Sequence, residues 1–431
     1  MIKKLLMLCI IMAFISPVIM AQSPFVKVEG NQFILNEKPY YYIGTNYWYG
    51  AIIASSGSYG DRPRLLRELD FMKENGITNL RIQAGAEGPD NEPFRVTPSM
   101  QVAPGKYSDE MLDGLDFLLS EMGKRGQHAI LFLNNSWDWS GGFAQYLNWN
   151  GYGPIPYPMV KPNTWPQFMA FAGQFLNCNK CKKQFFDHVK FLLNRTNRYT
   201  GIKYTEDPAI MTWEIGNEPR AFSTENIPVL EKYIQETASL IRGIDKNHLI
   251  TTGTEGQWGC ENSLEVFERI HAQPDIDYLT MHIWPKNWSW IDVKNIPGTL
   301  ETGIKNTNKY MDDHFAVARR LNKPIVFEEF GLPRDFHGYL PTEKTTGRDS
   351  YYVNAFEQVL DHCKRNDVLA GCNFWGFAGE GRPANLFWVK GDDYVGDPPN
   401  EEQGLNSVFS TDSTVPIIKK YNQKLVEMLK K

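Results

Sequence analysis

Residues Ile210-Met-Thr-Trp-Glu-Ile-Gly-Asn-Glu-Pro-Arg220 decide how the chain folds, because an apolar stretch here gives way to polar and charged residues. A strand that is buried on both faces is expected to read as such an apolar run. Pro324-Ile-Val-Phe-Glu-Glu-Phe-Gly331 has the same form further along the chain. Each stretch therefore predicts a buried strand that ends in carboxylates.

Together with these two stretches, eight such runs occur between Tyr40 and Phe377: Tyr41–Trp48, Thr78–Gln83, Ala129–Leu133, Ile210–Ile215, Leu249–Thr252, Tyr278–Ile283, Pro324–Glu329 and Gly371–Trp375. Helical patterns separate them, including Arg62–Glu74, Asp109–Lys124, Thr224–Arg242 and Tyr351–Arg365. No Gly-x-Gly-x-x-Gly follows the first run, which disfavours a dinucleotide-binding sheet. Eight strand-helix units predict an α/β fold, a closed (β/α)8 TIM barrel.

The regions outside the repeat refine this prediction. Phe25–Val28 and Gln32–Leu35 are expected to form an N-terminal β-hairpin that plugs the bottom of the barrel, and Val415–Leu429 a closing helix. Residues 134–182 and 376–414 make unusually long connections after strands three and eight. Long loops at the carboxyl end of a barrel tend to carry function, although about half of the rings in 134–182 are expected to pack as a satellite core.

Charge and composition exclude some classes of protein. The chain has 45 Lys and Arg against 50 Asp and Glu, a formal charge of −5, so a polybasic nucleic-acid binder is ruled out. Aromatic residues make up 13% of the 431 residues. This ring content favours a flat, hydrated ligand that stacks on aromatic side chains.

The first residues have the layout of a secretory signal peptide. Lys3 and Lys4 precede an apolar run over residues 5–20, and Ala21 supplies a small residue for cleavage. The run is too short for a comfortable membrane span. We therefore expect residues 1–21 to be a signal peptide, residues 22–431 to form a single (β/α)8 domain, and the protein to be secreted or periplasmic.

Five cysteines remain after that cleavage, so at least one lies outside any internal pairing. Cys178 and Cys181 have the two-residue gap of a zinc half-site, but no second pair follows at a suitable spacing. A local disulfide, two free thiols and a metal site all remain open, with the disulfide favoured in an oxidising compartment.

The two strand ends point to a reaction. In a barrel, the carboxyl ends of the strands share one rim, so Glu218 and the acid at the end of the seventh run are expected to converge. Such acids often cap helices or form salt bridges instead. Glycoside hydrolysis, however, needs a carboxylic acid that protonates the departing oxygen and a carboxylate that attacks the sugar or activates water.

Asn-Glu-Pro after the fourth strand, together with Glu-Phe-Gly after the seventh, resembles glycoside hydrolase family 5 from about residue 25 onward. The resemblance implies that Glu218 is the acid/base and Glu329 the nucleophile. Glu328 is the alternative nucleophile, but neighbouring strand residues face opposite ways, so only one of the two glutamates is expected to reach the barrel mouth.

The resemblance also implies roles for other side chains. Arg81 would hold the nucleophile ionised, Asn217 would contact the sugar 2-hydroxyl, and His282 would lie near the acid/base. Trp284 stands where the family often has a tyrosine that donates to the nucleophile, and an indole N–H can also donate. Further residues expected to bind substrate are Trp375, Trp137, Arg220 and Trp48.

The motif His282-Ile-Trp-Pro285 is similar to one in the endo-β-1,4-mannanase branch of the family. The short motifs after predicted strands one, three and eight agree with that branch. The expected activity is retaining endo hydrolysis of the β-1,4 linkages of mannan, glucomannan or galactomannan, without a cofactor or metal, by a monomer that has no nucleic-acid partner and no membrane span. Alternatives that remain are an exo-acting β-mannosidase or mannobiohydrolase, a β-1,4-endoglucanase, and a non-catalytic carbohydrate-binding barrel.

Overall fold

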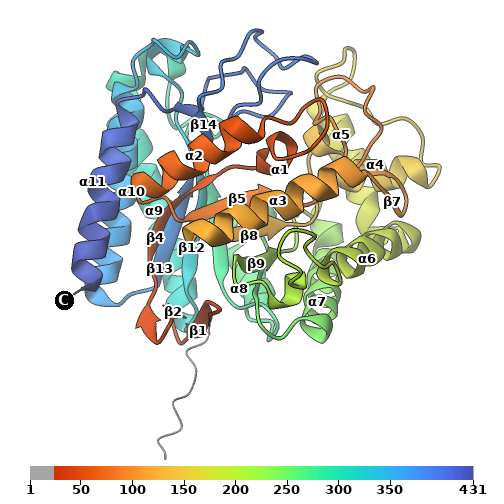
Figure 1. Cartoon of the computed structure of the whole chain (residues 1–431), viewed down its shortest axis with the longest axis horizontal. Coiled ribbons are helices and arrows are strands. Elements are labelled where there is room, and N and C mark those ends of the chain that lie inside the picture. Colours follow the sequence, from red (N-terminus) through yellow and green to blue (C-terminus); the bar gives the residue numbers. More distant parts are fainter. Residues whose placement is uncertain (1–23, 431) are drawn as a thin grey trace, which may run out of the picture.

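Eight parallel strands form the centre of the molecule in a computed structural model that describes residues 24–430 (Figure 1). They pair in the order β10-β9-β8-β5-β4-β13-β12-β11. The two end strands approach each other where the Asp277 amide donates to the Ile250 carbonyl at 2.8 Å. The strands are β4 (Tyr42–Asn46), β5 (Asn79–Gln83), β8 (His128–Phe132), β9 (Ile210–Glu214), β10 (Leu249–Thr251), β11 (Leu279–Ile283), β12 (Ile325–Phe330) and β13 (Leu369–Phe374).

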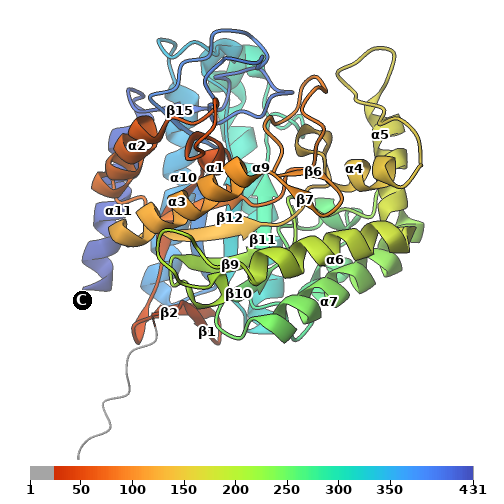
Figure 2. The same ribbon diagram turned by 45° about the vertical axis from the view of Figure 1, so that its right-hand side comes forward.

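A helix follows each barrel strand and covers its outer face, so the predicted (β/α)8 barrel is confirmed. Figure 2 shows α6 and α7 lying side by side on the outside. The covering helices are α2 (Arg62–Glu74), α3 (Asp109–Arg125), α6 (Asn179–Leu193), α7 (Ile227–Ile244), α8 (Leu264–His271), α9 (Ile296–Leu321), α10 (Thr346–Arg365) and α11 (Thr414–Leu429).

Local sequence explains where α3 begins and ends. The Ser108 hydroxyl accepts from the Met111 amide at the start of α3, which satisfies one of the free N–H groups there. At the other end Gly126 has φ 67°, a left-handed conformation that costs a glycine little. The predicted helix Asp109–Lys124 thus differs from the observed one by a single residue.

The amino ends of the barrel strands are covered by a small antiparallel sheet of β1 (Lys27–Glu29), β2 (Gln32–Leu35) and β3 (Lys38–Pro39). Phe33 is fully buried, and its ring lies 5.1 Å from that of Tyr278. The predicted plug is confirmed and gains a third strand. The predicted signal peptide lies outside the described residues. Within residues 24–430, no helix combines the length and the apolar character needed to span a bilayer.

The two long connections carry structure of their own. The first contains α4 (Gly142–Trp149) and α5 (Trp165–Ala172), and the second contains β14 (Phe377–Gly379) and β15 (Val408–Phe409). Shorter elements absent from the predicted set are α1 (Gly50–Ile53) after β4, and β6 (Gln101–Ala103) and β7 (Lys106–Tyr107) between β5 and α3. Both long connections leave the carboxyl ends of their strands, the end at which Figure 1 shows β14.

Cys178 and Cys181 form a disulfide at the start of α6, which decides among the three alternatives left open by their spacing. The other described cysteines, Cys260, Cys363 and Cys372, are free and buried.

Candidate active site

Glu218 enters the barrel mouth from a turn directly after β9. Its backbone has φ 52°, and its amide donates to the Gly253 carbonyl at 2.9 Å. The backbone N–H of the preceding residue, Asn217, donates to the backbone carbonyl of Asn134 at 2.8 Å. These contacts with the neighbouring strand ends aim the Glu218 side chain into the cavity.

Glu329 lies on β12, where the strand pairing is irregular. On one side Phe327 pairs with Met281 and Glu329 with His282, so two steps along β12 match one step along β11. A bulge of this kind breaks the strict alternation of side chains. Glu328 therefore also points into the barrel, where its Oε2 lies 3.4 Å from His282 Nε2.

Because of this bulge, the alternation expected for Glu328 and Glu329 is wrong. Alternation predicted that Glu328 and Glu329 face opposite ways, but both contact groups inside the barrel. They differ in depth instead. Glu329 lines the cavity, whereas Glu328 is fully buried and does not.

Glu218 and Glu329 face each other across a short gap. One carboxyl oxygen of each, together with one His282 nitrogen, lies within 4.8 Å of the others. Retaining glycosidases hold their two carboxyl groups about 5–5.5 Å apart, and inverting enzymes about 6.5–9.5 Å apart. A closest approach of two oxygens within 4.8 Å favours the shorter, retaining separation.

Arg81, in the middle of β5, is fully buried and binds two carboxylates. Its Nε and Nη2 donate to Glu214 at 2.8 and 2.6 Å, and its Nη1 donates to Glu329. Nη2 also donates to the Asn217 side-chain oxygen at 2.9 Å. A guanidinium with these contacts stabilises the ionised form of Glu329.

Two further side chains hold the carboxylates. His282 Nδ1 lies 2.8 Å from Glu218 Oε1 and 3.4 Å from Glu329 Oε2. The Trp284 indole donates to Glu329 Oε2 at 3.2 Å, so this tryptophan makes the contact expected of a tyrosine. An N–H here favours a negative charge on Glu329.

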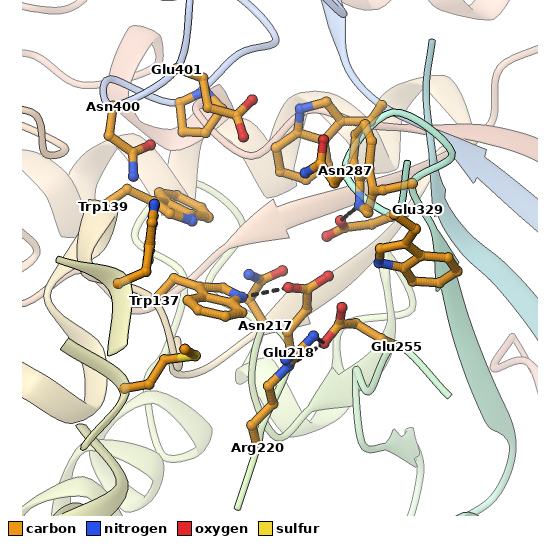
Figure 3. A pocket seen from close by; sticks show the side chains of 16 residues that line it. Trp137, Trp139, Asn217, Glu218, Arg220, Glu255, Asn287, Glu329, Asn400 and Glu401 are labelled. Carbon is orange, nitrogen blue, oxygen red and sulfur yellow. Dashed lines mark hydrogen bonds and ion pairs between the residues drawn. The ribbon is translucent and has the colours of Figure 1, made fainter. Parts of the chain in front are cut away.

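Glu218 has a second set of neighbours on its outer side. The Trp137 indole donates to Glu218 Oε2, and the Arg220 guanidinium lies 5.1 Å above the Trp137 ring (Figure 3). Arg220 in turn forms an ion pair with Glu255 in the loop after β10. Arg220 thus brings a positive charge near Glu218, and the Glu255 carboxylate balances the charge of Arg220.

Burial raises the pKa of both Glu218 and Glu329 because the charged forms lose water. At Glu329 the direct contact with Arg81 opposes that rise. The two carboxyl groups also repel each other when both are charged, so they titrate as a pair. The Arg81 contact favours the negative charge on Glu329 and leaves the proton on Glu218.

The carboxyl pair opens into a cavity of about 410 Å³. Its apolar lining includes Trp137, Trp165, Met169, Trp284, Trp288 and Trp375. Asn400 and Glu401, from the long loop after β13, lie across the cavity from Glu218 (Figure 3). The rings suit stacking on sugar faces, and the polar groups suit hydrogen bonds to hydroxyls.

The family model described as glycoside hydrolase family 5, β-mannosidase-like, matches residues 23–430. The chain belongs to glycoside hydrolase family 5. A family 5 mannosidase from Rhizomucor miehei, solved as a point mutant in complex with mannosyl-fructose, is 38% identical, with a TM-score of 0.88 over 95% of this chain and 99% of that one. The resemblance identified from the sequence is thereby confirmed.

Two other relatives widen the comparison. Mannan endo-1,4-beta-mannosidase 7 of Arabidopsis thaliana is 29% identical over 415 residues, covering 93% of this chain and 85% of that protein. The endo-beta-1,4-mannanase of Thermotoga petrophila shares the fold, with a TM-score of 0.66 and 24% identity over 90% of this chain and 77% of that one.

Most of the site residues expected for a family 5 enzyme lie at the carboxyl pair or in its cavity. Arg81 and His282 are fully buried behind the carboxylates and do not line the cavity, so they act on Glu218 and Glu329. The structure brings to the cavity Glu218, Glu329, Asn217, Trp137, Arg220, Trp284 and Trp375.

Trp48 is a correction. It was expected to bind substrate, but it is fully buried and does not line the cavity. Its indole donates to the Gly396 carbonyl at 2.8 Å, and its ring packs edge-on against Trp139. Trp48 therefore supports the loop after β13.

Several groups that line this family 5 site were not predicted from the sequence. Glu255 is the third residue after the fifth predicted strand, just as Glu218 is the third residue after the fourth. That equal spacing could have identified Glu255 as a residue of the site. Asn287, Asn400 and Glu401 lie in long loops, where no periodic pattern indicates which side chains turn inward.

Proposed function

We propose that this chain is a retaining endo-β-1,4-mannanase that hydrolyses mannan, glucomannan or galactomannan. The observation that carries the proposal is the Glu218 and Glu329 pair, with oxygens within 4.8 Å and Arg81 bound to Glu329. The names of the relatives supply the substrate class. They include mannan endo-1,4-beta-mannosidases and family 5 mannosidases.

The geometry supports a double displacement. Glu329 attacks C1 of the sugar as the bond from C1 to the leaving oxygen breaks, and Glu218 gives its proton to that oxygen. Glu218 then removes a proton from water, whose oxygen attacks C1 and releases Glu329. Arg81 and Trp284 stabilise the charge on Glu329 before the attack and after its release.

The first prediction of this proposal concerns stereochemistry. Because two inversions at C1 restore the original configuration, the first-formed product is expected to be the β anomer. Proton NMR of the products within the first minutes, before mutarotation, measures this. An α anomer at the start would contradict the double displacement.

The second prediction concerns the sugar. Mannose differs from glucose in its axial 2-hydroxyl, and polar groups that bind a hydroxyl can discriminate against its epimer. Asn217 borders the cavity beside both carboxylates. We expect kcat/KM for carboxymethylcellulose to be about 100-fold below that for mannan or glucomannan, about 2.7 kcal/mol in the transition state. Equal values on the two polymers would reject the mannan preference.

A specific observation favours exo action as the second candidate. Pro398, Asn400 and Glu401 form one side of the cavity and can limit how far a polymer extends through it. The solved mannosidase from Rhizomucor miehei is also similar over nearly its whole length. Viscosity decides between the two. Endo cleavage lowers the viscosity of a mannan solution early and yields several oligomers, whereas exo cleavage releases one short product and leaves the viscosity high.

We further propose that the protein is exported to the periplasm or the medium after loss of residues 1–21, and that residues 22–431 are its catalytic domain. The charged start, apolar run and small residue at position 21 support export. The mass and N-terminal sequence of the protein recovered from outside the cytoplasm test this proposal.

A further inference from the structure

The imidazole of His282 lies among three carboxyl groups, those of Glu218, Glu328 and Glu329. Its Nδ1 is 2.8 Å from Glu218 Oε1, and its Nε2 is 3.4 Å from Glu328 Oε2. A neutral imidazole has one N–H donor and one acceptor nitrogen. Burial lowers the pKa of His282 to about 3, so the ring is neutral. A carboxyl group must therefore donate a proton to the acceptor nitrogen, either Glu218 at Nδ1 or Glu328 at Nε2. If Glu218 did so, the Nδ1 lone pair would also face the ionised Glu329, 3.4 Å away.

The charges inside the barrel indicate which group does so. Glu214 and Glu329 each take direct hydrogen bonds from Arg81, whereas Glu328 lies 3.9 Å from Arg81 Nε. One guanidinium already faces two carboxylates, and a third charge in this buried interior would cost several kcal/mol. The groups that face Glu328 are Glu214 on β9, Arg81 on β5, His282 on β11, the adjacent Glu329, and the rings of Tyr42 and Tyr278.

Glu328 has the surroundings of a neutral acid. Its side chain is fully buried beside the Glu214 carboxyl, and within residues 24–430 its Oε1 has no hydrogen-bond donor. Burial raises its pKa, and the neighbouring Glu214 carboxylate raises it further. A carboxylate would leave buried lone pairs without donors, whereas a protonated acid can donate to a neighbour.

We propose that Glu328 is held protonated inside the barrel and donates its proton in a hydrogen bond to His282 Nε2, which fixes the tautomer that donates from Nδ1 to Glu218. Glu328 is thus a positioning residue that acts through His282. The consequence for Glu218 rests on the proposed function, in which Glu218 is the acid/base.

The fixed tautomer serves Glu218 after it has lost its proton. The Glu218 carboxylate then accepts an N–H from His282 at Oε1 and from Trp137 at Oε2. Donors on both oxygens stabilise the anion that forms as the leaving group departs. With the opposite tautomer, an Nδ1 lone pair would face the charged oxygen and repel it.

The tautomer can be measured directly by NMR of the full-length protein with ¹⁵N-labelled histidine. We expect the His282 ring to carry its proton on Nδ1 and none on Nε2 at neutral pH, with the signals assigned by their loss in His282→Gln. The His271 ring serves as an internal control, since its Nδ1 contacts the Phe267 carbonyl at 2.8 Å, away from Glu328. A proton on Nε2 of His282 in the wild type would overturn the proposal.

Two variants extend the test to activity. Glu328→Gln keeps a neutral side chain with an N–H donor, so kcat/KM on mannan is expected to stay within about threefold of wild type. Glu328→Leu removes the donor, so the His282 tautomer should change and kcat/KM should fall by about 100-fold. A Glu328→Gln variant as impaired as Glu328→Leu would overturn the proposal, because it would show that the carboxylate itself is required.

The outcomes also separate this inference from the proposed function. If the wild type hydrolyses no β-mannoside, the proposed function fails, while the His282 tautomer still reports the protonation of Glu328. If Glu328→Leu does not fold, the wild-type spectrum and the Glu328→Gln kinetics still decide the question.

Discussion

Replacing Glu329 with alanine is expected to lower kcat on mannan by more than about 10⁴-fold, because the nucleophile forms a covalent bond that binding energy cannot replace. Binding should persist, since the rings and amides that line the cavity remain. Arg81 keeps its two hydrogen bonds to Glu214, so the variant should fold. Reducing-end assays measure the loss of turnover, and calorimetric titration with a mannan oligomer measures binding.

Glu328→Gln is the matched control for this variant. It changes the adjacent glutamate in the same barrel interior and alters only one functional group. If Glu328→Gln abolished turnover while Glu329→Ala left it intact, the nucleophile would be Glu328. Loss of oligomer binding by Glu329→Ala would instead show that the variant had lost its cavity.

The barrel could be predicted from the sequence because its strands are buried on both faces. In β9, every residue of Ile210–Glu214 is buried, so the apolar run and the strand coincide. The predicted helix Arg62–Glu74 is also the observed α2. Here the Asp61 cap and the Asn75-Gly76 end are local signals, and no distant contact overrides them.

The residues of the candidate site could be predicted from the sequence mainly where they lie at the carboxyl ends of barrel strands. Glu218 and Asn217 follow such an end, and the structure brings Asn217 into contact with Arg81, which lies in the middle of β5. The bulge at Glu328 was not predictable from local sequence. It arises from the way β12 pairs with its two neighbours, β11 and β13, which lie elsewhere in the chain.

Loop side chains posed a different problem. Trp48 and Trp137 both follow barrel strands, yet Trp48 packs beneath the loop after β13 while Trp137 lines the cavity. What separates them is the course of residues 376–414. This course depends on buried contacts such as those of Arg348 with the Ser407 and Leu405 carbonyls. No local pattern encodes such contacts.

Replacing Glu218 with alanine should affect substrates unequally. On mannan, whose leaving group is a sugar alkoxide, kcat/KM is expected to fall by about 10³-fold, since general acid catalysis contributes about 10²–10⁴. On an aryl mannoside with a good leaving group, the first step needs little proton assistance. A burst of aryl alcohol should therefore remain, followed by slow release of the glycosyl-enzyme, and stopped-flow absorbance measures both phases.

The pH profile provides the control for that assignment. Burial raises the pKa of Glu218, so the proton needed for mannan cleavage is retained above the ordinary range of a glutamate and is lost as the pH rises through the raised pKa. Wild-type kcat/KM on mannan should thus fall on the alkaline side, whereas the burst rate of Glu218→Ala on the aryl mannoside should lack that fall. Azide, a nucleophile that needs no base, should speed the second phase in Glu218→Ala. Equal losses on both substrates, or no response to azide, would assign the acid/base role to another group in the cavity, with Glu255 next in position because its carboxyl is linked to Glu218 through Arg220.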